Sequence, residues 1–320
     1  MHKATILLVL PWAMVAETHT VAAEKYYRTF SHQHPVLKRI LAGDTVITKT
    51  VDSGGKDEKG VERSEGGNPL TGPFYIEGVE PGDAIAVRFH KVRLNRNWGT
   101  SSNRLGLYSL TPESVEKIFA GKRATWEIDL SAKKVRVTDP TSTKVKLEFA
   151  AKPMIGCVGV AAPGDFAPTS GPAGSYGGNL DYNAVGEGAT VILPAYHPGA
   201  LLFIGDGHAL QGDGEATGNG VETSMDVEFS VEVRKKIKLM GPRVETADEI
   251  ISVGAQPEFV SSLNRALQMA TTDMVDWLVT GYGLEPWAAH MLVSFQAKYD
   301  VVTVAGTMAL RIPKAVLPKP

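Results

Sequence analysis

The sequence predicts an α+β protein that is mainly β, with a β-sandwich or barrel-like core and a C-terminal pair of helices. Short or alternating apolar runs bounded by Gly, Pro and Asp extend from Tyr26 to about Val233. The 33 glycines and 19 prolines agree with many turns. After Gln256 the apolar spacing becomes helical. Strands followed by two helices and a last strand are typical of an α+β fold.

The strand patterns are clearest at five places along the body of the chain. Residues 44–51 are β-branched, and residues 74–77 and 84–89 flank a Pro-Gly-Asp turn. Residues 126–149 read as a meander with turns at Ser131-Ala132 and Asp139-Pro140. The best single strand is 225–233, where five apolar residues alternate with polar ones. Antiparallel pairing with one solvated face fits this alternation.

Two helices and a closing strand are expected at the C-terminal end. The first helix begins near Pro257-Glu258 and ends at Gly281 and Gly283, and Glu285-Pro286-Trp287 begins the second. A strand-like piece at 301–304 follows the helices. The predicted organisation of the whole chain is a signal peptide, a β-rich body, a helical segment and a closing strand, at residues 1–23, 24–245, 256–298 and 299–320.

The first 23 residues have the pattern of a secretory signal. Lys3 precedes a short apolar run over 6–16, and Val21-Ala22-Ala23 supplies the residues that a signal peptidase reads. The run is too short to span a bilayer, and we expect no membrane association after cleavage near Ala23. The sequence therefore predicts a periplasmic or secreted protein. A buried first strand or helix is the alternative interpretation.

Charge and cysteine content narrow the function. With 33 Lys and Arg against 35 Asp and Glu, the chain has no basic field, so nucleic acid is excluded as the main partner. Cys157 is the single cysteine, so no intrachain disulfide forms. Its apolar surroundings at 153–160 favour a small core residue. A nucleophilic Cys157 is the alternative, and it requires a nearby base.

Two glycine-rich stretches concentrate side chains that bind metals or move protons. Residues 171–181 end in Asn179-Leu180-Asp181, and residues 205–215 contain five such side chains, namely Asp206, His208, Gln211, Asp213 and Glu215. A mixture of imidazole and carboxylate favours a divalent metal, which we predict to be Zn²⁺, with a structural Ca²⁺ as the alternative. A water bound to the metal would become the nucleophile. The spacing matches neither an EF-hand nor a phosphate loop.

Two acids of the N-terminal half follow predicted strands. Glu77 stands at the end of a strand before a tight turn, and Asp52 follows the strand of 44–51. An acid in such a position can point into a pocket, although each alone is more commonly a turn residue.

Taken together, these motifs resemble the acetamidase/formamidase family. The similar segments run from about His34 to Pro313 and include 72–83, 153–161, 177–181, 205–215 and the helical tail 262–278. The resemblance implies hydrolysis of small linear amides, such as formamide or acetamide, to ammonia and a carboxylate. It also implies a β-rich fold with appended helices, a bound divalent metal and a homodimer.

The resemblance assigns roles to individual residues. The implied metal ligands are Asp206, His208 and Asp181. The implied catalytic acids are Glu77, Glu215 and Asp52. The implied substrate contacts are Asn179, Tyr176 and Gln211, and many relatives have His where this chain has Tyr176. Two alternatives stay open, namely a metal-stabilised extracytoplasmic binding module without catalysis and an amidase that depends on Cys157.

Overall fold

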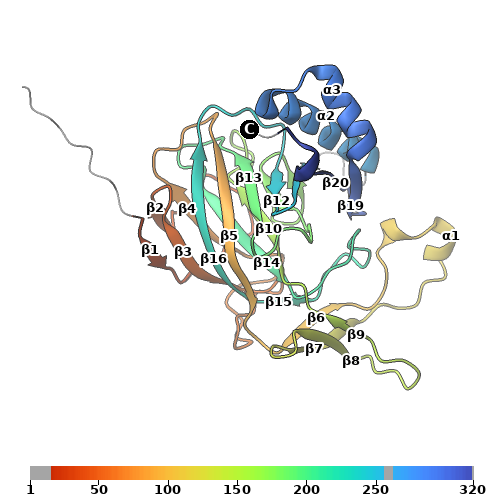
Figure 1. Cartoon of the computed structure of the whole chain (residues 1–320). Helices are drawn as coiled ribbons and strands as arrows, with labels where there is room; N and C mark the ends of the chain where they lie inside the picture. Colours follow the sequence, from red (N-terminus) through yellow and green to blue (C-terminus); the bar gives the residue numbers. More distant parts are fainter. Residues whose placement is uncertain (1–15, 256–261, 319–320) are drawn as a thin grey trace, which may run out of the picture.

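Two β-sheets pack face to face in the computed structural model, which describes residues 16–255 and 262–318 (Figure 1). Side chains of both sheets form one buried core, in which the rings of Phe74 and Phe229 lie 5.3 Å apart. A pair of helices covers one end of the sandwich. The predicted fold class, mainly β with a C-terminal helical pair, is confirmed.

Within the described residues the first sheet has nine strands. In spatial order they are β1 (Thr18–Thr20), β3 (Thr45–Thr50), β16 (Met225–Arg234), β5 (Ala84–Leu94), β13 (Thr190–Pro194), β17 (Arg243–Glu245), β18 (Glu249–Gly254), β20 (Thr307–Pro313) and β19 (Lys298–Thr303). The alternation predicted for 225–233 holds in β16, where Met225, Val227, Phe229 and Val231 are buried.

The second sheet carries the candidate functional residues. Its described strands are β11 (Ala173–Gly174), β12 (Gly177–Asn179), β10 (Met154–Val160), β14 (Leu202–His208), β15 (Glu222–Thr223), β6 (Trp98–Ser102), β7 (Arg123–Asp129), β8 (Lys134–Asp139) and β9 (Glu148–Ala150), with β4 (Leu70–Ile76) paired to β14 and β2 (Lys38–Ile40) paired to β4. β10 is buried along its whole length because it lies between β12 and β14 and faces the first sheet. β7, β8 and β9 form the predicted meander, which projects from the sandwich together with the short helix α1 (Pro112–Val115) (Figure 1).

The C-terminal helices are α2 (Leu263–Tyr282) and α3 (Pro286–Gln296). The Ser262 side chain caps α2 by accepting a hydrogen bond from the Arg265 amide, and Gly283 ends it in the left-handed conformation. α2 packs on β18 and β20, where Ala270, Met274 and Leu278 join a second buried cluster. The predicted helix start at Pro257-Glu258 lies outside the described residues.

The predicted closing strand of 299–320 is a hairpin, because β19 and β20 pair antiparallel around a turn after Thr303. β14 continues through the start of the glycine-rich stretch of 205–215, as far as His208. A β-carbon at Gly207 would lie 2.3 Å from the Met225 side chain, so glycine here lets β14 pass close to β16.

Part of the predicted signal segment belongs to the first sheet. β1 pairs parallel with β3, and the Asp44 carboxylate accepts from the Glu17 amide at 2.9 Å and lies 2.9 Å from His19 Nε2. Cleavage after Ala23 would remove these contacts. Among the described residues, no helix has the length and apolar character that crossing a bilayer requires.

Candidate metal centre

One buried cluster collects five acidic and imidazole side chains of the second sheet. Asp206 and His208 stand at the end of β14, Asp181 follows β12, and Glu222 lies on β15 beside His208. Glu215 comes from the connection between β14 and β15. Two overlapping sets have ligand atoms within 4.8 Å of one another, namely Asp181, Asp206 and His208, and His208, Glu215 and Glu222. The three predicted metal ligands therefore do meet.

The hydrogen bonds of Gln211 fix the tautomer of His208. Gln211 Nε2 donates to the backbone carbonyl of Asp181 at 2.5 Å, so its Oε1 accepts. That oxygen lies 2.7 Å from His208 Nδ1, which must then carry the proton. In the neutral ring the lone pair is on Nε2, the atom that faces the carboxylates. This is the arrangement that a metal-ligating histidine needs.

Each aspartate of the cluster has one oxygen held and the other without a partner. Asn68 Nδ2 donates to Asp206 Oδ2 at 3.1 Å, and Asn179 donates to Asp181 Oδ2. Among the described side chains, Asp181 Oδ1, Asp206 Oδ1, His208 Nε2 and Glu222 Oε2 are buried without a hydrogen-bond partner. His208 Nε2 lies 3.5 Å from Asp206 Oδ1 and 4.0 Å from Asp181 Oδ1. Because buried polar atoms are normally paired, converging unpaired donors of this chemistry fit a divalent metal.

The electrostatics of the cluster are those of acids forced together out of water. Burial, with help from neighbouring acids, raises the pKa of Asp181 well above its usual value. Burial is also the largest cause that raises the pKa of Glu215 to about 8 and that of Glu222 to about 7. Burial opposes charge on His208, but Glu222 and Asp206 outweigh it and hold its pKa well above the usual range. Such values are typical of functional sites.

The backbone around the cluster is shaped for it. Asp181, Asp206 and Glu215 adopt φ values of 47°, 55° and 44°, in the left-handed region that non-glycine residues rarely occupy. Gly156 of β10 lies beneath the aspartates, because a β-carbon there would sit 2.5 Å from Asp181 Oδ1 and 2.9 Å from Asp206 Oδ2. Strained backbone conformations and the absence of a side chain at Gly156 therefore coincide at the point where the carboxylates converge.

Cys157 lies beside the centre rather than in a purely apolar core. Its Sγ donates to Asn179 Oδ1 at 2.7 Å, and Asn179 in turn contacts Asp181. Burial, with Asp206 and Asp181 nearby, raises the pKa of the thiol well above its usual value. A thiol held protonated is a poor nucleophile, so this geometry does not favour a Cys157-dependent amidase.

Two predicted substrate contacts have structural partners instead. Gln211 is buried and bridges His208 and Asp181, so it orients a ligand. Tyr176 is buried, its ring lies 5.3 Å from that of Phe30, and its hydroxyl donates to the Pro172 carbonyl. The predicted contact Asn179 does lie at the centre, where it holds Asp181.

The predicted catalytic acid Asp52 lies outside the cluster and is connected to it through Arg96. Its carboxylate is buried, accepts from Arg96 at 2.6 Å and from the Lys56 amide at 2.8 Å. Arg96 also donates to the backbone carbonyl of Glu222 at 3.4 Å. Asp52 therefore supports the strand that carries Glu222, since both its oxygens are already engaged.

The predicted catalytic acid Glu77 does not reach the centre. Leu70, at the start of β4, pairs with Gly205, whereas Glu77 follows the other end of that strand, roughly 20 Å away at the usual rise per residue. There it forms a half-exposed ion pair with Arg39 at 2.9 Å. Of the predicted acids, only Glu215 lies in the cluster.

Sequence analysis missed Glu222 and Asn68. Glu222 alternates with Val221 and Thr223 and looks like the outward residue of a short strand. Asn68 stands in an ordinary Gly-Gly-Asn-Pro turn, and its φ of 53° is visible only in the structure. The available signal was an acid between Gly220 and the strong strand that begins at Met225.

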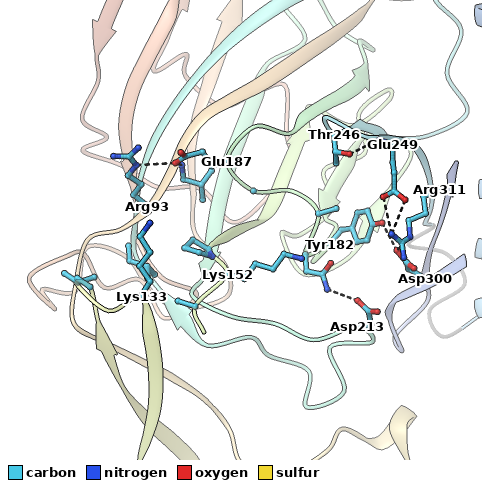
Figure 2. A pocket seen from close by; sticks show the side chains of 18 residues that line it. Arg93, Lys133, Lys152, Tyr182, Glu187, Asp213, Thr246, Glu249, Asp300 and Arg311 are labelled. Atoms are coloured by element: carbon cyan, nitrogen blue, oxygen red, sulfur yellow. Dashed lines mark hydrogen bonds and ion pairs between the residues drawn. The ribbon is translucent and has the colours of Figure 1, made fainter. Parts of the chain in front are cut away.

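Two cavities adjoin the centre. The smaller, about 470 Å³, includes Glu222 in its lining. The larger, about 940 Å³, is shown in Figure 2 and begins at Tyr182 and Asn183, directly after Asp181. In it Asn183 donates to Asp213 at 2.7 Å, and the Tyr182 hydroxyl donates to Asp300 at 2.8 Å. The larger cavity is thus lined by the residues directly after Asp181, and the smaller one is lined by Glu222, an acid of the centre itself.

The fold and this centre define a β-rich protein with a buried carboxylate–histidine site, and comparisons show which known proteins it resembles. The acetamidase/formamidase family model matches residues 164–316. An acetamidase structure from Yersinia enterocolitica is 28% identical, has a TM-score of 0.81 and is matched over 96% of this chain and 95% of its own. The acetamidase from Bacillus halodurans is 27% identical with a TM-score of 0.76, over 92% and 97%.

A curated relative points the same way. A candidate formamidase of Schizosaccharomyces pombe is 27% identical over 258 residues, which is 63% of this chain and 62% of that protein. The match therefore spans less than two thirds of the relative's length. The comparisons thus agree in showing similarity to the acetamidase/formamidase family.

Proposed function

We propose that the protein is an amidohydrolase that hydrolyses the C–N bond of small linear amides to ammonia and a carboxylate. The observation that carries this proposal is the convergence of four buried atoms from Asp181, Asp206, His208 and Glu222, none of which has a hydrogen-bond partner among the described residues. Similarity to the acetamidase/formamidase family suggests the reaction class, since the solved relatives are named acetamidases.

In this proposal Asp181, Asp206 and His208 would hold a divalent metal, with Glu215 and Glu222 beside it. The imidazole and carboxylate set favours Zn²⁺. When bound, the metal would supply a Lewis acid and lower the pKa of water.

The chain's own residues perform the remaining tasks. Gln211 keeps the proton of His208 on Nδ1, so that Nε2 stays available. Glu215 and Glu222, with pKa values raised by burial to about 8 and about 7, are suited to take a proton from water and to return it to the nitrogen. The return is required because an amide nitrogen leaves readily only when it is protonated.

The test combines metal content with turnover. We expect the purified protein to contain a stoichiometric divalent metal and to release ammonia from formamide or acetamide, and chelation to abolish the release. His208→Ala should lose both the metal and at least about a hundredfold in activity, because the only imidazole ligand is removed. His290→Ala, an exposed histidine of α3, is the matched control. Full activity and full metal content in His208→Ala would contradict the proposal.

The same samples separate the rival functions. A binding module with a structural ion would lose thermal stability on chelation but would show no ammonia release before it. An amidase that depends on Cys157 would survive chelation and lose activity in Cys157→Ala.

We also propose export and a homodimer, as the sequence and the family resemblance suggest. Residues 17–21 contact β3 and its neighbours, so cleavage after Ala23 would remove these contacts from the mature protein. N-terminal sequencing of the exported protein decides whether cleavage falls after Ala23 or before Glu17. Sedimentation velocity gives the oligomeric state.

A further inference from the structure

The cavity that reaches Glu222 has an unusual charge distribution. Its volume is about 470 Å³, within the usual range of small-molecule sites. Its wall carries the cations Arg104, Lys122 and Arg123, and Glu222 is the only acid among the described residues that line it. The other polar lining is mostly hydroxyl groups, from Ser53, Thr100, Ser101 and Ser102.

These cations have no carboxylate partner among the described residues. None of the ion pairs formed within residues 16–255 and 262–318 includes Arg104, Lys122 or Arg123. Arg123 donates to the Thr100 hydroxyl at 2.8 Å, which directs it along the cavity wall. On the neighbouring strand β8, in contrast, Lys134 and Arg136 each pair with a glutamate.

The cations are also brought together by the local backbone. A β-carbon at Gly121 would lie 2.5 Å from Arg104 Cδ and Nε, so the arginine side chain lies directly over this glycine. Lys122 and Arg123 follow Gly121 in sequence. The missing side chain thus lets Arg104 lie next to two further positive charges in one concave wall.

A small neutral amide does not require the three cations of this wall for binding. Formamide and acetamide are uncharged and need only hydrogen-bonding partners near the centre. A carboxylate, in contrast, accepts charge-assisted hydrogen bonds from guanidinium and ammonium groups, and a concave wall of one sign attracts it. Because Glu222 lines the same cavity, a singly charged group is favoured over a doubly charged phosphate.

We propose that the substrate is an amide with a carboxylate group at its other end, and that Arg104, Lys122 and Arg123 bind this carboxylate while the amide reaches Glu222 and the centre. This inference rests on the proposed function. The simplest substrate of this class is succinamate. Water adds to its amide carbon, a proton of that water passes to the nitrogen, and the C–N bond breaks, so that succinamate and water give hydrogen succinate and ammonia.

Succinamate and succinamide form a matched pair, because they have nearly the same shape and differ in the charge of one end. We expect kcat/KM for succinamate to exceed that for succinamide by at least about tenfold. Added NaCl should narrow this ratio, since it screens exposed charges. Arg104→Gln/Lys122→Gln should reduce the ratio to about one, chiefly through KM for succinamate.

The control variant is Lys238→Gln/Lys298→Gln. It removes two exposed lysines that lie outside the cavity and make no ion pair, and it should keep the wild-type ratio. Circular dichroism and thermal melting confirm that both double variants are folded. Equal kcat/KM for the two amides in the wild type, or an unchanged ratio in Arg104→Gln/Lys122→Gln, would overturn the inference.

The outcomes separate this inference from the proposed function. Hydrolysis of neutral amides without preference for succinamate would support the proposed amidase activity and reject the binding of a substrate carboxylate by the three cations. If no amide is hydrolysed, the proposed function fails. Calorimetry with succinate and with inorganic phosphate then tests separately whether Arg104, Lys122 and Arg123 bind a carboxylate. Succinate binding that weakens at least tenfold in Arg104→Gln/Lys122→Gln supports it; tighter binding of phosphate, or equal binding to both proteins, rejects it.

Discussion

At the scale of single residues, the centre depends on groups that make space and fix orientation as much as on its ligands. Gly156 offers no side chain where Asp181 and Asp206 converge. Gln211, Asn68 and Asn179 each hold one atom of a ligand and leave another free. The ligands are thus aimed before any ion binds, which limits the entropy that binding must overcome.

Gly156→Ala should disrupt the centre without touching a ligand. The new methyl group would lie 2.5 Å from Asp181 Oδ1 and 2.8 Å from the Asp206 carbonyl, so both must move. We expect metal affinity to fall by about tenfold to a hundredfold, as for loss of an outer-shell contact. Competition with a fluorescent chelator measures the affinity. Gly212→Ala is the control, because its β-carbon would meet nothing within 4 Å. Unchanged affinity in Gly156→Ala would refute this account of β10.

At the scale of elements, turn residues tie the strands together. Asp83, just before β5, accepts from the Glu80 amide, from the Lys236 amide and from Lys235 Nζ, so it joins the start of β5 to the end of β16. Its hydrogen bond from Lys235 is the largest cause that lowers its pKa to about 2, with the Glu80 amide next.

The pH dependence of Asp83→Asn follows from this shift. Because the folded pKa lies below the ordinary 3.8, the ionised carboxylate stabilises the fold above about pH 4, and this contribution is lost as pH falls toward 2. The gap in free energy of unfolding between wild type and Asp83→Asn should be largest at pH 5 to 7 and shrink between about pH 4 and 2. Urea unfolding at each pH measures the gap. A gap independent of pH would show that the carboxylate charge contributes nothing.

Local pattern explains which parts of this architecture could be predicted. Period-two apolar residues specify β16 and β5, and helical spacing specifies α2, because burial of one face decides both. The density of ligand types at 205–215 revealed Asp206 and His208. Glu77 was misplaced because sequence does not say which end of β4 meets β14. Asn68 was missed because its role depends on Asp206, more than a hundred residues away, and Glu222 because only the pairing of β15 with β14 brings it beside His208.

At the scale of the whole molecule, the first described residues complete the sheet edge. Thr45 N donates to Glu17 O at 2.8 Å, Val21 N donates to Ile47 O at 2.9 Å, and Thr48 Oγ1 donates to Val21 O at 2.7 Å. These bonds join β1 to β3, the next strand of the nine-stranded sheet. A mature protein that begins at Glu24 would present the β3 edge instead.

We expect a chain that begins at Glu24 to be less stable than one that begins at Ala16. Loss of the edge strand and of its contacts with Asp44 should lower the free energy of unfolding by about 2 kcal/mol, the scale of a few partly exposed hydrogen bonds. Chemical unfolding of the two chains checks this value. Equal stability would mean that the edge strand contributes nothing, which would remove the objection to cleavage after Ala23.

Different segments of the chain supply the centre and the cationic wall of the cavity. Every ligand of the centre lies between Asp181 and Glu222, inside the 164–316 region of the family match, whereas the cationic wall comes from 104–123. In the proposed enzyme, the residues that carry out the reaction and those that bind the substrate would therefore be encoded in separate segments. A transplant of 100–123 from a relative would exchange one wall of the cavity and leave every metal ligand in place, which makes this segment the natural unit for altering selectivity in the laboratory.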